Sequence, residues 1–382
     1  MLNHLNIKSY FLYNSIKYYI KLDFEETEIL TGVLSKYKAA LDFMKKSNIA
    51  PVFEKTFGNL PAYNDIIPAR KELFNEMKIS IPPLSFVEGS QVNRSIASIL
   101  FCGILKTADD VKIEYYKNGD TVLGTIHQTP HARYLYLYGL KNSNPAGSKS
   151  VYDNYQELFN KLELYIIENG FLPRDILRTW IYLSDITENY ADFNKARREF
   201  FEKNGIGYSS DFNELPASTC IGGSGPGSKI SMNLVCIDKK RIFPKIKRIY
   251  NEFQNEAEGN AYLFKPTFSR ALLVEDEYLS ELHISGTASI NTAGETVYKN
   301  DPYNQIKKTM LNVSAVMKQA NQNFEDLCES TCFFKKPEYF HYYLDVVNEL
   351  KIHHFSGTHV IGDICREDLL FEFDGVTIRN KN

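Results

Sequence analysis

The sequence predicts an α+β fold in which tandem units carry mixed sheets with helices packed on one face. Two observations predict this class. Apolar runs typical of strands are interspersed with segments of helical spacing, and the order strand, helix, strand, helix, strand occurs twice along the chain. The length of 382 residues is enough for two domains of ordinary size. With 43% hydrophobic and 24% charged residues, the composition is that of a globular protein and excludes a disordered or disulfide-dense one.

Three parts are expected along the chain. Residues 1–45 are predicted to be an N-terminal extension, with helical character from residue 23 onward. Residues 46–240 should form an N-terminal half, and residues 241–382 a C-terminal half that carries Glu372. The two halves would lie side by side, so that a cleft can form at their junction.

The elements of each half follow from periodicity and turn residues. Asn118, Gly119 and Asp120 predict a tight turn that joins two strands as a hairpin. Asp301 and Pro302 predict the start of a helix, because Asp caps a helix and Pro fits its first turn. The N-terminal half is predicted to contain strands at 98–105, 111–116, 121–126 and 133–140, a helix over 155–166, a strand at 178–186, a helix over 190–202 and a strand at 229–237. The C-terminal half is predicted to contain a strand at 280–290, a helix over 306–317, a strand at 330–336, a helix over 338–350 and a closing segment at 359–375.

Charge and cysteine content exclude several classes of protein. With 44 Lys and Arg against 47 Asp and Glu, the net charge of −3 argues against a nucleic-acid binder, which would show a basic excess. The N-terminal residues lack the apolar core of a signal peptide, and no apolar run approaches the ~20 residues of a membrane helix. Cys328 and Cys332 form the one close pair of cysteines, without the second pair that a zinc site needs. We therefore expect a soluble, cytoplasmic protein with no metal site and with reduced thiols.

Glu372 is the first candidate for chemistry. It lies in the segment LLFEFDG, where strand alternation places Glu372 and Asp374 on one face and Phe371 and Phe373 on the other. A carboxyl group among apolar neighbours would have a raised pKa and could act as a general acid. The alternative is an exposed carboxylate on the strand surface. Cys365 precedes Glu372 by seven residues, and a thiol of this kind is usually a small buried side chain unless its setting makes it reactive.

Two arginines border apolar runs, where a charge must find a partner. Arg178 opens the segment RTWIYL, and Arg270 lies in KPTFSRALL. The planar guanidinium matches the two oxygens of a carboxylate, so either arginine could hold an acidic ligand. The alternative for each is a structural ion pair with Asp or Glu.

In combination, six segments resemble the chorismatase family, whose body is built of RidA/YjgF-like (chorismate-mutase-like) α/β units. The closing segment GDICREDLLFEFDG carries the resemblance most specifically, and the matching stretches together span roughly residues 130–376. The six segments are residues 178–186, 190–201, 216–223, 265–273, 285–298 and 362–375.

The resemblance implies an enzyme that acts on chorismate, a dicarboxylate ring with an enolpyruvyl ether. Glu372 falls at the position of the family's acid and would protonate the methylene carbon of the enolpyruvyl group, which leads to loss of the ether bond and release of pyruvate. Arg178 and Arg270 would hold the two carboxylates. The route requires no metal and no organic cofactor, and neither a nucleic acid nor a membrane is an expected partner.

The resemblance also bears on the product. Members that form 3-hydroxybenzoate have a Cys seven residues before the acid, as Cys365 is here, so this product is favoured over the dihydroxycyclohexadiene carboxylate of the chorismate hydrolases. Gly286 and Ala288 are expected to shape the opposite wall of the pocket. A non-catalytic RidA-like carboxylate-binding protein and an imine hydrolase of the RidA type are the alternatives from other classes. A monomer and a homotrimer are both open.

Overall fold

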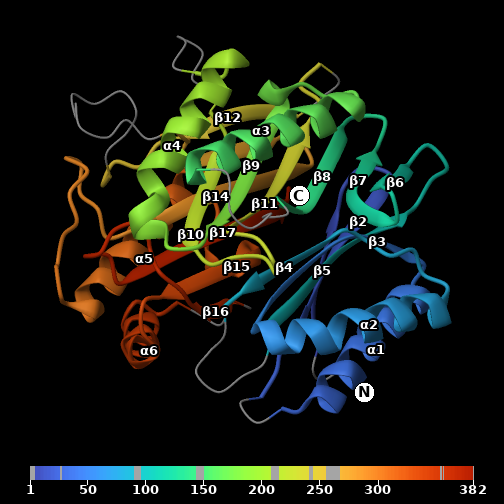
Figure 1. Ribbon diagram of the computed structural model, residues 1–382, viewed down its shortest axis with the longest axis horizontal. Helices are drawn as coiled ribbons and strands as arrows, with labels where there is room; N and C mark the ends of the chain where they lie inside the picture. The colour runs from blue at the N-terminus through green and yellow to red at the C-terminus, as the bar shows by residue number, and fades with distance from the viewer. Residues whose placement is uncertain are drawn as a thin grey trace.

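The computed structural model describes residues 5–25, 28–89, 96–142, 150–207, 215–240, 244–254, 267–352, 355 and 357–381. These residues form three sheets, each with a pair of helices (Figure 1). We call each sheet with its helices a unit and number the units along the chain.

The first unit has a five-stranded sheet in the order β1-β2-β5-β3-β4. Its elements are β1 (Leu5–Phe11), β2 (Ser15–Leu22), α1 (Leu30–Lys46), β3 (Ile49–Gly58), α2 (Leu60–Met77), β4 (Leu84–Glu88) and β5 (Ile96–Lys106). Helix α2 begins after Asn59, whose side chain accepts a hydrogen bond from the Ala62 N–H, with Pro61 in the first turn.

The second and third units have six-stranded sheets, in the orders β10-β9-β11-β8-β7-β6 and β12-β13-β14-β17-β15-β16. The second contains β6 (Lys112–Asn118), β7 (Thr121–Gln128), β8 (Arg133–Lys141), α3 (Val151–Glu168), η1 (Pro173–Asp175), β9 (Ile176–Leu183), α4 (Ile186–Lys203), β10 (Ala217–Gly222) and β11 (Ile230–Ile237). The third contains β12 (Lys245–Ile249), β13 (Ala271–Glu275), β14 (Leu279–Ala288), α5 (Pro302–Gln319), η3 (Phe324–Asp326), β15 (Leu327–Phe334), η4 (Pro337–Tyr339), α6 (Phe340–Glu349), β16 (Thr358–Ile361) and β17 (Phe371–Asn380). The hairpin predicted around Gly119 and the helix start predicted at Asp301 are both confirmed.

All three units share one topology. In each, antiparallel strands lead into a helix, a strand, a second helix and a parallel edge strand, and the last strand then inserts between the earlier ones. The first unit differs only in having one antiparallel strand fewer at the start. The predicted tandem α+β fold is confirmed, but the structure contains three repeats where the sequence predicts two.

The division at residue 45 therefore differs from the structure. Residues 5–22 are not an extension, because β1 and β2 pair with each other and β2 pairs with β5 of the same sheet. The strand pattern there is obscured by buried lysines. The Lys17 ammonium lies 3.1 Å from the Glu281 carboxylate of the third unit, and Lys21 donates to the Gly357 carbonyl at 2.8 Å. In a sequence pattern, a lysine indicates a solvent-exposed position, and an inward-facing lysine cannot be recognised before its distant partner is known.

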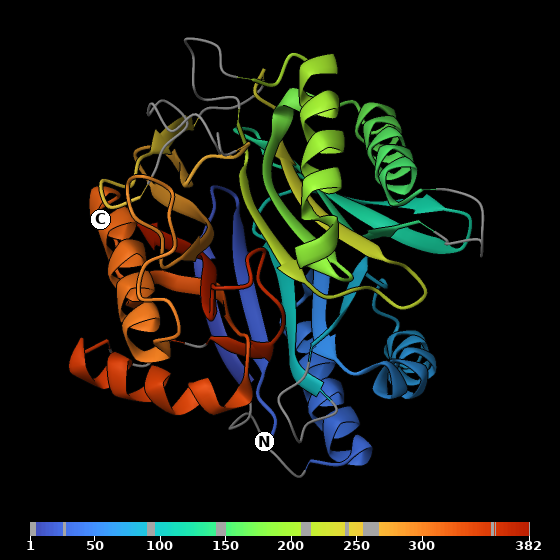
Figure 2. The ribbon, with the colours of Figure 1, turned by 60° about the vertical axis from the view of Figure 1, so that its left-hand side comes forward.

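Helices cover the outer face of each sheet, and the inner faces meet one another (Figures 1 and 2). Each helix pair has its own apolar core against its sheet, whereas one central core combines residues of all three sheets. Near the centre, Phe57 of β3, Tyr182 of β9 and Phe333 of β15 occupy equivalent positions. The ring centroid of Phe57 lies 6.0 Å from that of Tyr182 and 6.3 Å from that of Phe333. The units are thus arranged with approximate threefold symmetry.

The units contact one another in a closed cycle. Each unit contacts one neighbouring unit through its parallel pair of strands, and it contacts the other neighbouring unit through its antiparallel strands. The three junctions are marked by hydrogen bonds from Glu88 N to Ser224 O at 2.8 Å, from Ser218 N to Ser285 Oγ at 2.8 Å, and between the hydroxyls of Ser98 and Thr358 at 2.9 Å. A single chain therefore closes the ring of three units by itself.

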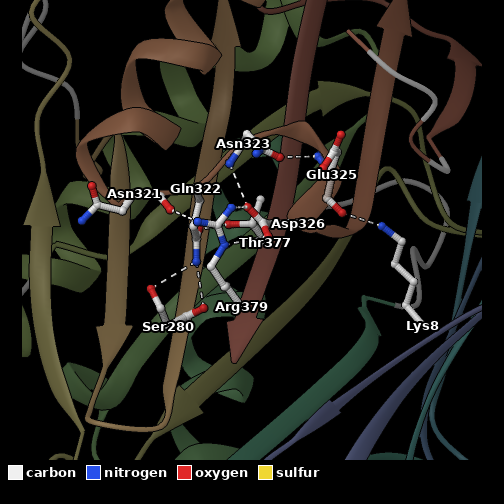
Figure 3. Close-up of polar contacts among 9 residues, drawn as sticks. All are labelled: Lys8, Ser280, Asn321, Gln322, Asn323, Glu325, Asp326, Thr377 and Arg379. Carbon is white, nitrogen blue, oxygen red and sulfur yellow. Dashed lines mark hydrogen bonds and ion pairs between the residues drawn. The ribbon is translucent and has the colours of Figure 1, made fainter. Parts of the chain in front are cut away.

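A polar network anchors the far end of β17 (Figure 3). The Arg379 guanidinium binds both oxygens of Asp326, at 2.9 and 2.6 Å. The Gln322 amide donates to the Ser280 carbonyl at 2.8 Å, and Lys8 of β1 donates to the Glu325 carbonyl at 2.9 Å. These contacts fix the loop before β15 against β14, β17 and the first unit. They hold in place the strand whose opposite end carries Glu372.

Candidate active site

Glu372 lies at the junction between the second and third units. It is the second residue of β17, where it pairs with Ala288 of β14 on one side and with Phe333 of β15 on the other. The side chain is buried, with 5% of the residue exposed, so the alternative of an exposed strand carboxylate is excluded. Burial raises the pKa of Glu372 to about 8, and the negative charge of Asp374 adds to this effect. Three arginines, Arg270, Arg178 and Arg366, act in the opposite direction.

The strand alternation predicted for this segment is confirmed. Phe371 and Phe373 belong to the core between the third sheet and its helices. Glu372 and Asp374 are buried on the opposite face, toward the second unit. The carboxyl groups are thereby directed to the junction and away from the helices.

Gly286 provides the space for the Glu372 carboxyl group. It lies in an irregular stretch of β14, where the register against β17 shifts between Ile284 and Thr287. A Cβ atom at this position would overlap Glu372 Oε1 and lie 3.3 Å from the Thr219 Cγ2 methyl of β10. Ala288, which is buried and paired with Glu372, forms the adjacent part of the wall. Both residues therefore border Glu372.

Arg178 reaches the junction from β9 of the second unit. It is fully buried, and its Nη2 donates to Thr219 Oγ1 at 2.5 Å and to Asp374 Oδ2 at 3.3 Å. The aromatic ring of Trp180 packs against it, with 4.6 Å between the guanidinium carbon and the ring centroid. Its Nε and Nη1 have no hydrogen-bond partner among the described residues. The structural ion pair therefore occupies only part of this guanidinium, and two buried nitrogens with their N–H groups remain for another acceptor.

Arg270 precedes β13 of the third unit and is also buried. Its guanidinium carbon lies 5.2 Å from the ring centroid of Phe268, and its positive charge acts on Glu372. Arg366, which the sequence gave no reason to select, is a further cation near Glu372, and its Nη1 donates to the Gly294 carbonyl at 2.8 Å. The junction thus combines a buried carboxyl group of raised pKa with several arginines.

Cys365 lies in the loop between β16 and β17 and is partly buried. Burial raises the pKa of its thiol to about 12, and the charge of Glu372 contributes in the same direction. At neutral pH this side chain is a neutral thiol and not a thiolate nucleophile. The effect of the Glu372 charge on this thiol, and its packing against both the central core and the core of the second unit, place Cys365 near Glu372.

The other two junctions lack this combination of groups. The position of Glu372 beside Phe333 is equivalent to that of Ser231 beside Tyr182 and of Ser98 beside Phe57. Four residues earlier on the same central strands, the position of Arg178 in the second unit is occupied by Glu329 in the third unit and by Phe53 in the first. Among the described residues, one junction alone therefore has the carboxyl group opposite the arginine.

A small cavity between the first and third units occupies the junction at Ser98. It is lined by Lys21, Lys55, Ser98, Glu329 and Thr358, among others. The Lys55 ammonium lies 2.9 Å from the Glu329 carboxylate, so these two charges neutralise each other. Among the described residues, the Glu372 junction alone combines a buried carboxyl group of raised pKa with a guanidinium that has nitrogens without a partner.

Two further findings concern metals and membranes. Across the described ranges, no group of three or more His, Cys, Asp or Glu side chains is arranged to hold a metal ion. In that same part of the chain, each helix is too short or too polar to cross a membrane.

The chain is similar to several known proteins. The family model described as endoribonuclease L-PSP matches residues 268–361, which lie in the third unit. A 3-hydroxybenzoate synthase from Streptomyces hygroscopicus is 26% identical over 251 residues, covering 59% of this chain and 68% of that protein. A crystal structure of a chorismatase covers 86% of this chain and 93% of its own, with a TM-score of 0.62 and 18% sequence identity.

These findings define the fold as tandem α+β units of the RidA-like class. Within that class, they confirm the resemblance to the chorismatase family that the sequence segments indicate.

Proposed function

We propose that this protein cleaves chorismate and releases pyruvate and 3-hydroxybenzoate, with Glu372 as the acid. One observation carries the proposal: the charge of Arg178 acts on a buried carboxyl group whose pKa is raised to about 8, and the Nε and Nη1 of Arg178 have no hydrogen-bond partner among the described residues. The relatives named 3-hydroxybenzoate synthase and chorismatase support the substrate class.

The proposed reaction begins with proton transfer from Glu372 to the methylene carbon of the enolpyruvyl group. The positive charge that develops at the ether carbon is an oxocarbenium centre, which water can attack before the ether bond breaks and pyruvate leaves. A general acid for this step must hold its proton near neutral pH, which the buried setting of Glu372 favours. Hydrolysis consumes one water molecule. If the ring then becomes aromatic, one water molecule is released, so that the formation of pyruvate and 3-hydroxybenzoate consumes no net water.

Arg178 and Arg270 are proposed to bind the two carboxylates of the substrate. Arg178 is held on one side by Thr219 and Asp374, so its remaining N–H groups have a fixed direction. Binding two carboxylates would orient the enolpyruvyl group toward Glu372 and offset the negative charge of the substrate. Gly286 and Ala288 would border the pocket, and none of these steps calls for a metal or an organic cofactor.

Cys365 favours 3-hydroxybenzoate over the dihydroxycyclohexadiene carboxylate of a chorismate hydrolase. The thiol is proposed to act in the pocket as a neutral group, because burial raises its pKa to about 12. The cytoplasmic location, the reduced state of the thiols and the choice between monomer and trimer stay predictions.

The test is to incubate the purified protein with chorismate and no cofactor, to follow pyruvate, and to separate the aromatic products by chromatography. Pyruvate and 3-hydroxybenzoate in equal amounts would support the proposal. Pyruvate with a non-aromatic diene acid would support the hydrolase. Pyruvate release no faster than the spontaneous reaction would contradict cleavage and favour a RidA-like carboxylate-binding protein or an imine hydrolase.

A further inference from the structure

Two buried carboxyl groups lie next to each other on β17. Glu372 and Asp374 are two residues apart on one face of the strand, which separates their Cα atoms by about 7 Å. The residues are 5% and 0% exposed. Two ionised carboxylates at such a distance, away from water, repel each other strongly, so one of them favours its protonated form.

The contacts of the two groups differ. Asp374 Oδ2 accepts a hydrogen bond from Arg178 Nη2 at 3.3 Å, within an ion pair whose two side chains are at most 1% exposed. A buried guanidinium needs a negative partner, and Asp374 is the carboxylate that Arg178 contacts. The Glu372 carboxyl group accepts no hydrogen bond from the described residues. The ion pair with Arg178 is thus formed by Asp374, whereas the raised pKa belongs to Glu372.

We propose that Asp374 is the positioning residue of this site: it fixes the Arg178 guanidinium and, by its charge, keeps the proton on Glu372. This inference deepens the proposed function and rests on it. One carboxylate would thereby serve two purposes, because the charge that orients the arginine also stabilises the acid form of its neighbour.

The surroundings of each carboxyl group determine what its removal would do. The charges that act on Glu372 are those of Asp374, Arg270, Arg178 and Arg366. The Cys365 thiol is buried near it. Asp374 also lies within electrostatic reach of further groups on the neighbouring strands, namely Lys55, Tyr182 and Cys332. The negative charge of Asp374 raises the pKa of Glu372, and the three arginines lower it. If the charge of Asp374 is removed, the effect of the arginines is less offset. Glu372 would then lose its proton at a lower pH.

The variant Asp374→Asn separates charge from position. The Asn side-chain oxygen can still accept the hydrogen bond from Arg178 Nη2, but it carries no charge. We expect the basic limb of the kcat/KM profile for pyruvate release to move down by about one pH unit or more. At pH 6 the variant should stay within about threefold of the wild type, whereas at pH 8 it should be about tenfold slower. The variant Asp374→Ala, which also releases Arg178, should raise KM in addition.

A matched control is Asp326→Asn, which removes the charge of the η3 residue that pairs with Arg379 at the end of β17 remote from Glu372. Its pH profile should coincide with that of the wild type. A shift equal to that of Asp374→Asn would mean that loss of any such ion pair moves the profile, and the proposal would be wrong. An unchanged profile for Asp374→Asn would overturn it as well.

A second readout does not depend on turnover. Infrared difference spectroscopy follows the carbonyl stretch of a protonated carboxyl group during a pH titration. The signal of the wild type should be lost in Glu372→Gln and should titrate at lower pH in Asp374→Asn. A signal that survives in Glu372→Gln and disappears in Asp374→Asn would place the proton on Asp374 and overturn the inference. If the wild type released no pyruvate, the proposed function would fail, while this titration would still decide where the proton lies.

Discussion

Gly286 leaves free the volume that the Glu372 carboxyl group occupies. The two residues lie on adjacent strands of the third sheet, and a Cβ atom on residue 286 would overlap Glu372 Oε1. The close approach, and not an unusual backbone angle, is the reason for glycine at this position.

We therefore expect Gly286→Ala to displace the acid. Because the neighbouring Thr219 methyl closes the other side, the carboxyl group must move away from its position in the junction. A displacement of this kind should lower kcat for pyruvate release by about 100-fold. Gly207→Ala is the matched control, since no atom lies within 4 Å of a Cβ built there. Equal activity of Gly286→Ala and the wild type would show that Glu372 does not act from this position.

The rate should depend on pH through Glu372. A general acid is active while it is protonated, and the pKa of Glu372 is about 8. We expect kcat/KM to be level below this pH and to fall about tenfold per unit above it. A profile that falls only around pH 4.5, the ordinary range of a glutamate, would contradict the raised pKa.

The raised pKa of Glu372 should also make the stability of the protein depend on pH. Between pH 4.5 and about 8 the folded protein holds a proton on Glu372 that the unfolded chain has lost, so folding becomes less favourable as the pH rises through this range. The variant Glu372→Gln lacks this titration. It should unfold at higher temperature than the wild type at pH 8, and the difference should shrink toward pH 4.

Cys365→Ala tests the choice of product. If the thiol takes part in aromatisation, the variant should release pyruvate within about tenfold of the wild-type rate while 3-hydroxybenzoate falls relative to pyruvate. Chromatography of the products against pyruvate gives the ratio directly. Cys102→Ala controls for the loss of a buried thiol outside the junction. An unchanged ratio in Cys365→Ala would remove the role assigned to this thiol.

A buried ion pair joins the first and third units. Lys17 and Glu281 lie 3.1 Å apart, and each side chain is 3% exposed. Lys17→Met would leave the Glu281 carboxylate buried with His283 as its remaining close partner, and should lower the free energy of unfolding by about 3–5 kcal/mol in urea titrations. Adding Glu281→Gln to this variant should restore part of the loss, because the unpaired charge is then removed. Equal stability of the two variants would contradict the coupling.

The sequence predicted the helices and most strands of the second and third units because their alternation and caps are local features, but β10, β12 and β13 were not predicted. Glu372 could be selected in the same way, since Phe371 and Phe373 define the opposite face of its strand. The first unit was missed because Lys17 and Lys21 face inward and find their partners more than 200 residues away. The partnership of Arg178 with Asp374 could not be predicted, because residues 196 positions apart meet only when two units pack together.

The most direct test of the central claim compares the wild type with Glu372→Gln, using chorismate. Calorimetry would measure binding, and a coupled assay would measure pyruvate. Because the arginines are intact in the variant, we expect its Kd to stay within about fivefold of the wild type, while kcat falls by 100-fold or more through loss of the acid. Pyruvate release by Glu372→Gln at the wild-type rate would contradict the assignment of Glu372 as the acid that cleaves chorismate.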